Sequence, residues 1–131
     1  MDRSLHPVTN QTRLARTRNV LCVDADDTSR LLIAEILYEH EVDFALTADD
    51  AVQLAHSRRY DLCFVDPAVP GFADFDLLAE LRTFDTRVPI VICSAGERAV
   101  GEGADVRARL LKPLSAAAIR DAATRFMRSS R

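Results

Sequence analysis

Five short runs dominated by apolar residues, with helical segments between them, constrain the fold of this chain more than any other feature. Continuous apolar runs of this length are typical of strands that are buried on both faces, as in parallel sheets covered by helices. The runs lie at 19–23, 43–47, 61–65, 88–93 and 108–111. We therefore expect five strands in one largely buried sheet.

The stretches between these runs have the periodicity of helices. In 29–40, the side chains of Leu32, Ile33, Ile36 and Leu37 fall on one face of a helix. Further helical patterns lie at 49–59, at 74–84 and around 119–126. Regular alternation of strands and helices predicts parallel βαβ crossovers, and hence a doubly wound α/β fold with helices on both faces of the sheet.

The connection between the fourth and fifth runs is an exception to this pattern. Three of the four glycines in the chain, Gly96, Gly101 and Gly103, lie between Cys93 and Ala108. Each glycine inside a helix costs up to ~1 kcal/mol of helix stability. We therefore expect the fourth crossover helix to be short or irregular.

Length and composition predict one globular domain, because 131 residues are 48% hydrophobic and 28% charged. Residues 1–18 carry four arginines against one aspartate and have no periodicity, so we expect a flexible basic tail before a domain at 19–131. The chain has a net charge of −3, which leaves −6 for the domain and argues against direct DNA binding. No run is long enough to span a membrane and the N-terminus has no apolar signal region, which predicts a cytoplasmic location.

The cysteines and histidines form no pattern typical of a metal site. Each cysteine lies in an expected strand, so we interpret all three as reduced core residues: Cys22, Cys63 and Cys93. The histidines are scattered, and we expect each of them to face solvent: His6, His40 and His56.

Polar residues follow four of the five runs at the point where each run ends. Asp24 follows the first run, with Asp26 close behind it, and Asp66, Ser94 and Lys112 follow the third, fourth and fifth runs. Ligands bind beyond the carboxyl ends of the strands in an open α/β sheet, so these side chains are expected to converge. One aspartate at a strand end is usually a turn or helix cap. A whole set at one edge predicts a binding or reaction site.

The chemistry of this set suits phosphoryl transfer. Carboxylates at the end of the first strand are ligands that Mg²⁺ prefers, and Asp66 is a candidate nucleophile toward a phosphoryl group. The Lys112 ammonium would balance charge on the phosphoryl oxygens, to which the Ser94 hydroxyl could donate a hydrogen bond.

Residues 19–131 resemble the receiver domain of response regulators in two-component signalling. The resemblance rests on four motifs, "LCVDADDTSR" at 21–30, "YDLCFVDPAVPG" at 60–71, "VPIVICSA" at 88–95 and "LLKPL" at 110–114. It implies a flavodoxin-like five-stranded parallel sheet in the order 2-1-3-4-5, and a cis bond between Lys112 and Pro113.

The resemblance also implies a function, that of a stand-alone response regulator rather than an enzyme. Asp66 would accept a phosphoryl group from a histidine kinase or a phosphotransfer protein, and Ser94 and Lys112 would contact that group. Mg²⁺ would be held by Asp24 and Asp66, with Asp26 as a further candidate ligand. The signal would pass to a downstream protein target through a protein–protein interaction.

Two of the departures from the family pattern affect the metal site and the output surface. Ala25 stands at the second position of the usual acid pair, where the family has a direct metal ligand, so Mg²⁺ binding is expected to be weakened. Arg109 stands where the family often has a switching aromatic residue. The acceptor residues are therefore present, while the output surface is expected to differ.

Three alternatives remain open. Ala25 favours a receiver-like module that binds partners without being phosphorylated. Asp24, Asp26 and Thr28 also fit the D-x-D-x-T motif of haloacid-dehalogenase-type phosphatases, with Asp24 as nucleophile and Asp26 as acid and base. That reading lacks the later acids needed to bind Mg²⁺ and leaves "VDPAVPG" unexplained. Finally, Lys112 and Asp66 could form a buried ion pair with a purely structural role.

Overall fold

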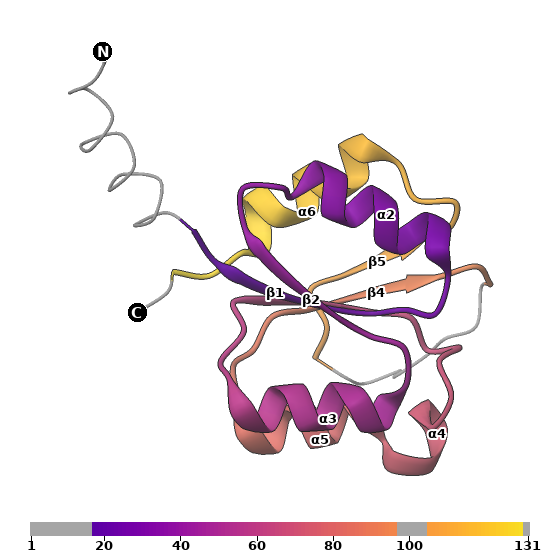
Figure 1. Ribbon diagram of the computed structural model, residues 1–131, viewed down its shortest axis with the longest axis vertical. Coiled ribbons are helices and arrows are strands. Elements are labelled where there is room, and N and C mark those ends of the chain that lie inside the picture. The colour runs from indigo at the N-terminus through magenta and orange to yellow at the C-terminus, as the bar shows by residue number, and fades with distance from the viewer. Residues whose placement is uncertain (1–16, 97–104, 130–131) are drawn as a thin grey trace.

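The computed structural model describes residues 17–96 and 105–129 and contains one five-stranded parallel sheet (Figure 1). The strands are β1 (Asn19–Val23), β2 (Glu41–Ala45), β3 (Leu62–Val65), β4 (Ile90–Ser94) and β5 (Ala108–Leu111). Their order in the sheet is β2-β1-β3-β4-β5, which confirms the predicted fold. All five strands therefore end at the same edge of the sheet.

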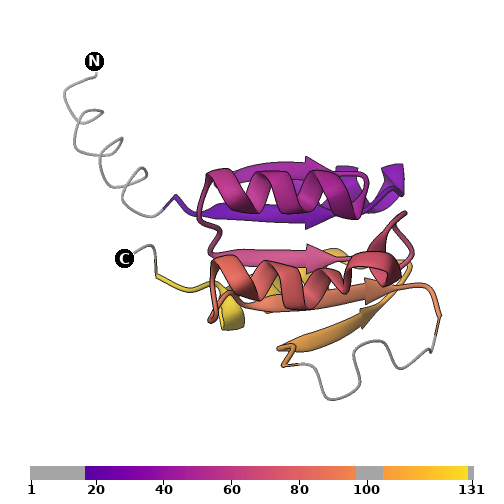
Figure 2. The ribbon, with the colours of Figure 1, turned by 90° about the horizontal axis from the view of Figure 1, so that it is seen from below.

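Helices cover both faces of the sheet (Figures 1 and 2). They are α2 (Asp27–Ile36), α3 (Ala48–Ser57), α4 (Phe72–Phe75), α5 (Leu77–Phe84) and α6 (Ala116–Phe126). In Figure 1, α2 and α6 lie on one side of the sheet, and α3, α4 and α5 lie on the other. Residues 97–104, which make up most of the predicted irregular crossover between β4 and β5, lie outside the described residues.

Side-chain caps fix the start of three helices. The Thr47 hydroxyl accepts a hydrogen bond from Asp50 N at 3.1 Å and begins α3, and the Ser115 hydroxyl accepts one from Ala118 N at 3.0 Å and begins α6. Asp26 caps α2 in the same way through Thr28 N. Each cap satisfies a backbone N–H that has no partner within its helix.

The second strand lies two residues earlier than the predicted range of 43–47. Its register pairs Asn19 with Glu41 and Val23 with Ala45, so the strand is complete before Thr47 turns to cap α3. The edge strands are also less buried than we expected. In β5 exposed residues alternate with partly buried ones, because β5 is an edge strand of the sheet formed by the described residues.

Two hydrophobic layers, one on each face of the sheet, form the core. On one face, Leu21 and Val65 pack with residues of α3 and α5, and on the other, Cys22 and Phe64 pack with residues of α2 and α6. The three cysteines are buried and free, as predicted. Burial raises the pKa of the Cys63 and Cys93 thiols to about 12, so both remain protonated at neutral pH.

His40 does not face solvent as we expected. Its side chain is 13% exposed, and its Nδ1 accepts a hydrogen bond from Arg18 N at 3.1 Å. Burial lowers the pKa of this imidazole, which favours the neutral form that can accept this bond. His56 is exposed on α3, and His6 lies outside the described residues.

Arginine side chains hold both ends of the described chain against the sheet. Arg18 Nε donates to Arg128 O at 3.2 Å. Arg128 in turn donates to Tyr60 O at 2.6 Å and to both carboxylate oxygens of Asp85. Residues 1–16 of the predicted tail lie outside the described residues.

Replacing Leu21 by alanine should lower the free energy of unfolding by roughly 2–5 kcal/mol, because this side chain is fully buried in the core layer between the sheet and helices α3 and α5. Leu31→Ala provides the matched control, since Leu31 is 70% exposed on α2, and it should change stability by less than ~0.5 kcal/mol. Urea unfolding measures both. Equal losses in the two variants would contradict the assigned burial.

Replacing Asp85 by asparagine should lower stability at pH 7 by roughly 1–2 kcal/mol, because it removes a charge-assisted bond to Arg128. The Arg128 hydrogen bond lowers the pKa of Asp85 from its ordinary value of 3.8. This stabilisation is therefore present above pH 3.8 and is lost as the pH falls through the folded-state pKa.

The free energy of unfolding, measured from pH 7 down to pH 2, should fall less steeply with decreasing pH for Asp85→Asn than for the wild-type protein. Asp121→Asn is the control, because its ion pair with Arg125 is exposed and 3.7 Å long. An equally steep fall in the free energy of unfolding of the wild-type and Asp85→Asn proteins would contradict the role given to the bond between Asp85 and Arg128.

Candidate functional site

Two carboxylates and one ammonium group meet at the edge where the strands end. Asp24 follows β1, Asp66 follows β3 and Lys112 follows β5. Lys112 Nζ lies 2.6 Å from Asp66 Oδ2 and 3.0 Å from Asp24 Oδ1. The sequence prediction that these three residues converge is thus realised as a triad with a formal charge of −1.

The triad is held by the sheet itself. Backbone N–H groups of the three residues donate to carbonyls on neighbouring strands: Asp24 N to Ala45 O at 2.9 Å, Asp66 N to Val23 O at 2.8 Å and Lys112 N to Ser94 O at 2.8 Å. The pairing of parallel strands therefore fixes where each side chain starts.

Each carboxylate also accepts a hydrogen bond from a nearby backbone N–H. Asp26 N donates to Asp24 Oδ1 at 2.9 Å, and Ala68 N donates to Asp66 Oδ1 at 2.8 Å. Such bonds stabilise the ionised form and fix the orientation of the carboxylate. The second oxygen of Asp66 is the one directed to Lys112.

Burial makes this arrangement costly unless the charges are paired. Asp24 is 2% exposed and Asp66 8% exposed, and the Lys112 side chain is 9% exposed. A charge taken out of water must find an opposite charge and hydrogen bonds. The ammonium is therefore required by the two carboxylates, whatever further role it has.

The pKa shifts follow from the same balance. Burial raises the pKa of Asp24, and the hydrogen bonds from Asp26 N and Lys112 Nζ only partly oppose that shift. Burial lowers the pKa of Lys112, but the hydrogen bonds to Asp66 and Asp24 outweigh it, so the net shift is upward. Lys112 is thus firmly charged at neutral pH.

Asp26 lies at the margin of the triad. Its carboxylate accepts hydrogen bonds from Thr28 N at 3.2 Å and from the Ser29 hydroxyl at 2.9 Å, and its Oδ2 is 3.6 Å from Lys112 Nζ. The Ser29 bond lowers the pKa of Asp26. In the described part of the chain, no three His, Cys, Asp or Glu side chains form a group able to hold a metal ion.

Ser94 is beside the triad, but its hydroxyl is directed elsewhere. Ser94 Oγ donates to Gly96 O at 3.0 Å, within its own loop. The Lys112–Pro113 peptide bond is cis, as the family resemblance implies.

Ser29 and Arg30 also support the site. Ser29 is 3% exposed and orients the Asp26 carboxylate, while an Arg30 guanidinium nitrogen donates to Asp24 O at 3.1 Å. Ser29 was not among the residues predicted for the site. Its position three residues after an N-cap aspartate is the signal that could have found it.

Comparisons with known proteins show the family and the fold of this chain. Residues 20–124 match the family model of the response regulator receiver domain. The probable transcriptional regulator ycf29 of Porphyra purpurea is 31% identical over 81 residues, which cover 59% of this chain and 39% of that protein. This chain therefore matches well under half the length of that relative.

Solved structures show the same fold. The receiver domain of the sensor histidine kinase PA1611 from Pseudomonas aeruginosa PAO1, which has a magnesium ion in its active-site cleft, superposes with a TM-score of 0.74 at 22% identity, over 85% of this chain and 98% of that chain. The chemotaxis protein CheY4 of Vibrio cholerae gives a TM-score of 0.74 at 20% identity, over 84% of this chain and 98% of that chain.

The chain belongs to the response regulator receiver domain family of two-component systems. Receiver domains are in general signalling domains rather than enzymes. Among the described residues, no helix is long and apolar enough to cross a membrane.

Replacing Asp24 by asparagine should raise the free energy of unfolding at pH 7 by on the order of 1 kcal/mol. Because the folded-state pKa of Asp24 lies above its ordinary value of 3.8, its ionisation destabilises the fold as the pH rises from 3.8 through that pKa. The gain should vanish near pH 3, where the carboxyl is protonated in both states. Urea unfolding at the two pH values measures this, and a less stable variant at pH 7 would contradict it.

Proposed function

We propose that this domain accepts a phosphoryl group on Asp66 and passes a signal by binding another protein. The observation that carries the proposal is the triad, in which a buried carboxylate at a strand end contacts both a fixed backbone N–H and an ammonium group. An ammonium in this place can balance charge that develops on phosphoryl oxygens. Lys112 contacts two carboxylates, so the three groups together keep a formal charge of −1 that a further cation could offset.

In the proposed reaction, an oxygen of Asp66 attacks the phosphorus of a phosphohistidine on a histidine kinase or phosphotransfer protein. The new O–P bond forms as the P–N bond breaks, and the imidazole leaves with the electron pair of that bond and is then protonated. The product is an acyl phosphate on Asp66. Lys112 stays charged throughout, because its pKa is raised.

Mg²⁺ is the proposed cofactor, and the donor set fits it in part. Asp24 and Asp66 present oxygens to one cation position, which the Lys112 ammonium shares, and Mg²⁺ commonly uses one or two carboxylates and keeps several waters. Bound there, the ion would neutralise phosphoryl oxygens. Asp26 would have to leave its cap on α2 to become a ligand.

Phosphorylation would change the contacts of two residues. The Lys112 ammonium would exchange its bond to Asp66 Oδ2 for a phosphoryl oxygen, and the Ser94 hydroxyl would leave Gly96 O to donate to another. Such a change shifts the balance between two conformations of the loops after β3 and β4. A partner protein that binds one conformation better would read the signal.

A second candidate is a receiver-like module that binds partners without phosphorylation. Ala25 is exposed beside Asp24 and supplies no ligand, and Lys112 already neutralises much of the charge of the two buried carboxylates. The phosphatase alternative loses support, because the Asp26 carboxylate that would serve as acid and base is engaged by Thr28 N and Ser29 Oγ.

Intact-mass measurement after incubation with acetyl phosphate tests the proposal. The wild-type protein should gain the mass of one phosphoryl group in the presence of Mg²⁺, and Asp66→Asn should gain none. Lys112→Arg should retain a charge but react more slowly, because a guanidinium cannot reproduce a compact ammonium between two carboxylates.

The controls separate the alternatives. A folded wild-type protein that forms no adduct, with or without Mg²⁺, would contradict the phosphoacceptor and favour the phosphorylation-independent module. An adduct that persists in Asp66→Asn but disappears in Asp24→Asn would favour the phosphatase mechanism.

A further inference from the structure

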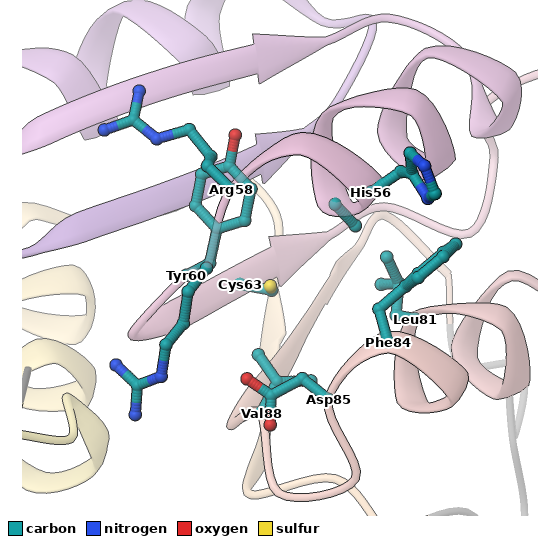
Figure 3. Close-up of a pocket in the computed structure, with 10 residues that line it drawn as sticks. His56, Arg58, Tyr60, Cys63, Leu81, Phe84, Asp85 and Val88 are labelled. Carbon is teal, nitrogen blue, oxygen red and sulfur yellow. The ribbon is translucent and has the colours of Figure 1, made fainter. Parts of the chain in front are cut away.

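Two cavities adjoin at the opposite edge of the sheet, where the strands begin. The first has a volume of about 510 Å³ and lies between α3 and α5 (Figure 3). Its lining combines apolar residues and the rings of His56, Tyr60 and Phe84 with three charged residues, Arg58, Arg59 and Asp85. The His56 and Phe84 rings meet edge to face with centroids 5.4 Å apart. This cavity is suited to a flat, largely apolar group.

The second cavity, of about 480 Å³, is lined by five arginines and one aromatic ring. Arg59 lines both cavities, and the ion pair between Arg128 and Asp85 joins the lining of one to that of the other. The arginines come from separate parts of the chain, before β3, β4 and β5 and at the end of α6: Arg59, Arg87, Arg107, Arg125 and Arg128. Both volumes fall in the range of small-molecule sites.

Positive charge is in excess here, although the chain as a whole carries −3. Three carboxylates pair with three of the five guanidinium groups: Asp61 with Arg59, Asp85 with Arg128 and Asp121 with Arg125. Within residues 17–96 and 105–129, the exposed side chains of Arg87 and Arg107 form no ion pair. Among the described residues, these five guanidinium groups and their three carboxylate partners sum to +2, a charge that attracts anions.

Helix ends explain part of this cluster. Arg125 lies in the last turn of α6, where a positive charge complements the helix dipole, and Arg128 fastens the chain to Tyr60 O and Asp85. Arg87 and Arg107 lie in connections rather than in the last turn of a helix. Their approach to three other arginines costs repulsion unless an anion offsets it.

We propose that the two cavities together bind a nucleoside polyphosphate. Its phosphates would contact the guanidinium groups of Arg87, Arg107 and Arg59, which recognise phosphate oxygens through pairs of parallel hydrogen bonds. Its base would enter the first cavity and stack on the Phe84 or His56 ring. The site lies at the far edge of the sheet from Asp66 and is independent of the proposed phosphorylation.

Isothermal titration calorimetry with ATP and with inorganic tripolyphosphate tests both halves of the site. ATP should bind the wild-type protein, and the double variant Arg87→Gln/Arg107→Gln should bind both probes at least tenfold more weakly. Arg120→Gln is the matched control, because it removes an exposed arginine of α6 that does not line the cavity, and it should leave both affinities unchanged.

A second variant separates the base from the phosphates. Phe84→Leu should weaken ATP severalfold and leave tripolyphosphate unchanged, since the ring is part of the first cavity alone. If the double variant does not fold, the single variants Arg87→Gln and Arg107→Gln replace it. Each of them should bind ATP and tripolyphosphate more weakly than the wild-type protein does. All variants at this edge should unfold at urea concentrations close to that of the wild-type protein, which reports an intact fold.

Four results would overturn the proposal. These are absence of ATP binding to the wild-type protein, an equal loss of affinity in Arg120→Gln and in the double variant, or an unchanged ATP affinity in Phe84→Leu. The fourth is tighter binding of a single-stranded oligothymidylate than of ATP, with an affinity that falls steeply as the salt concentration rises. That result would show that the arginines bind a nucleic-acid backbone instead.

Discussion

The contact of one ammonium group with two buried carboxylates is the interaction on which the functional edge of this domain depends. Lys112 follows β5 at one edge of the sheet, whereas Asp24 and Asp66 follow two of its inner strands, β1 and β3. The parallel topology therefore brings the three charges together, and the charges in turn link the ends of strands that are not neighbours. Without the ammonium, two carboxylates would be buried without a counter-charge, at a cost of several kcal/mol.

Charge is divided between the two edges of the same sheet. Carboxylates gather where the strands end, and arginines gather where they begin. The division has a structural origin, because helices that follow parallel strands begin at the first edge and end at the second, and their dipoles favour acids at the one and bases at the other. Helix dipoles do not account for all of these charges. Three further charges are fixed in the triad at one edge, and Arg87 and Arg107 lie in the second cavity at the other.

The sequence predicts much of the fold and of the triad, for a physical reason. Strand-end positions follow from the apolar runs, and in a parallel sheet every strand end lies at one edge, so convergence of Asp24, Asp66 and Lys112 requires no knowledge of side-chain orientation. The bond of Ser94 to Gly96 depends on a rotamer, which periodicity does not determine. The limits of β2 depend on its register with β1, and the cavity lined by arginines depends on the loops between elements. Periodicity does not determine either of them.

A titration with Mg²⁺ tests the claim that Asp24 and Asp66 form a single cation position. Thermal unfolding of the wild-type protein and of Lys112→Met would be followed as the Mg²⁺ concentration rises, because an ion that binds the folded state raises the unfolding temperature. We expect a larger rise for Lys112→Met, in which no ammonium competes for the two carboxylates, and no rise for Asp24→Asn/Lys112→Met. An equal rise in wild-type and Lys112→Met proteins would contradict it.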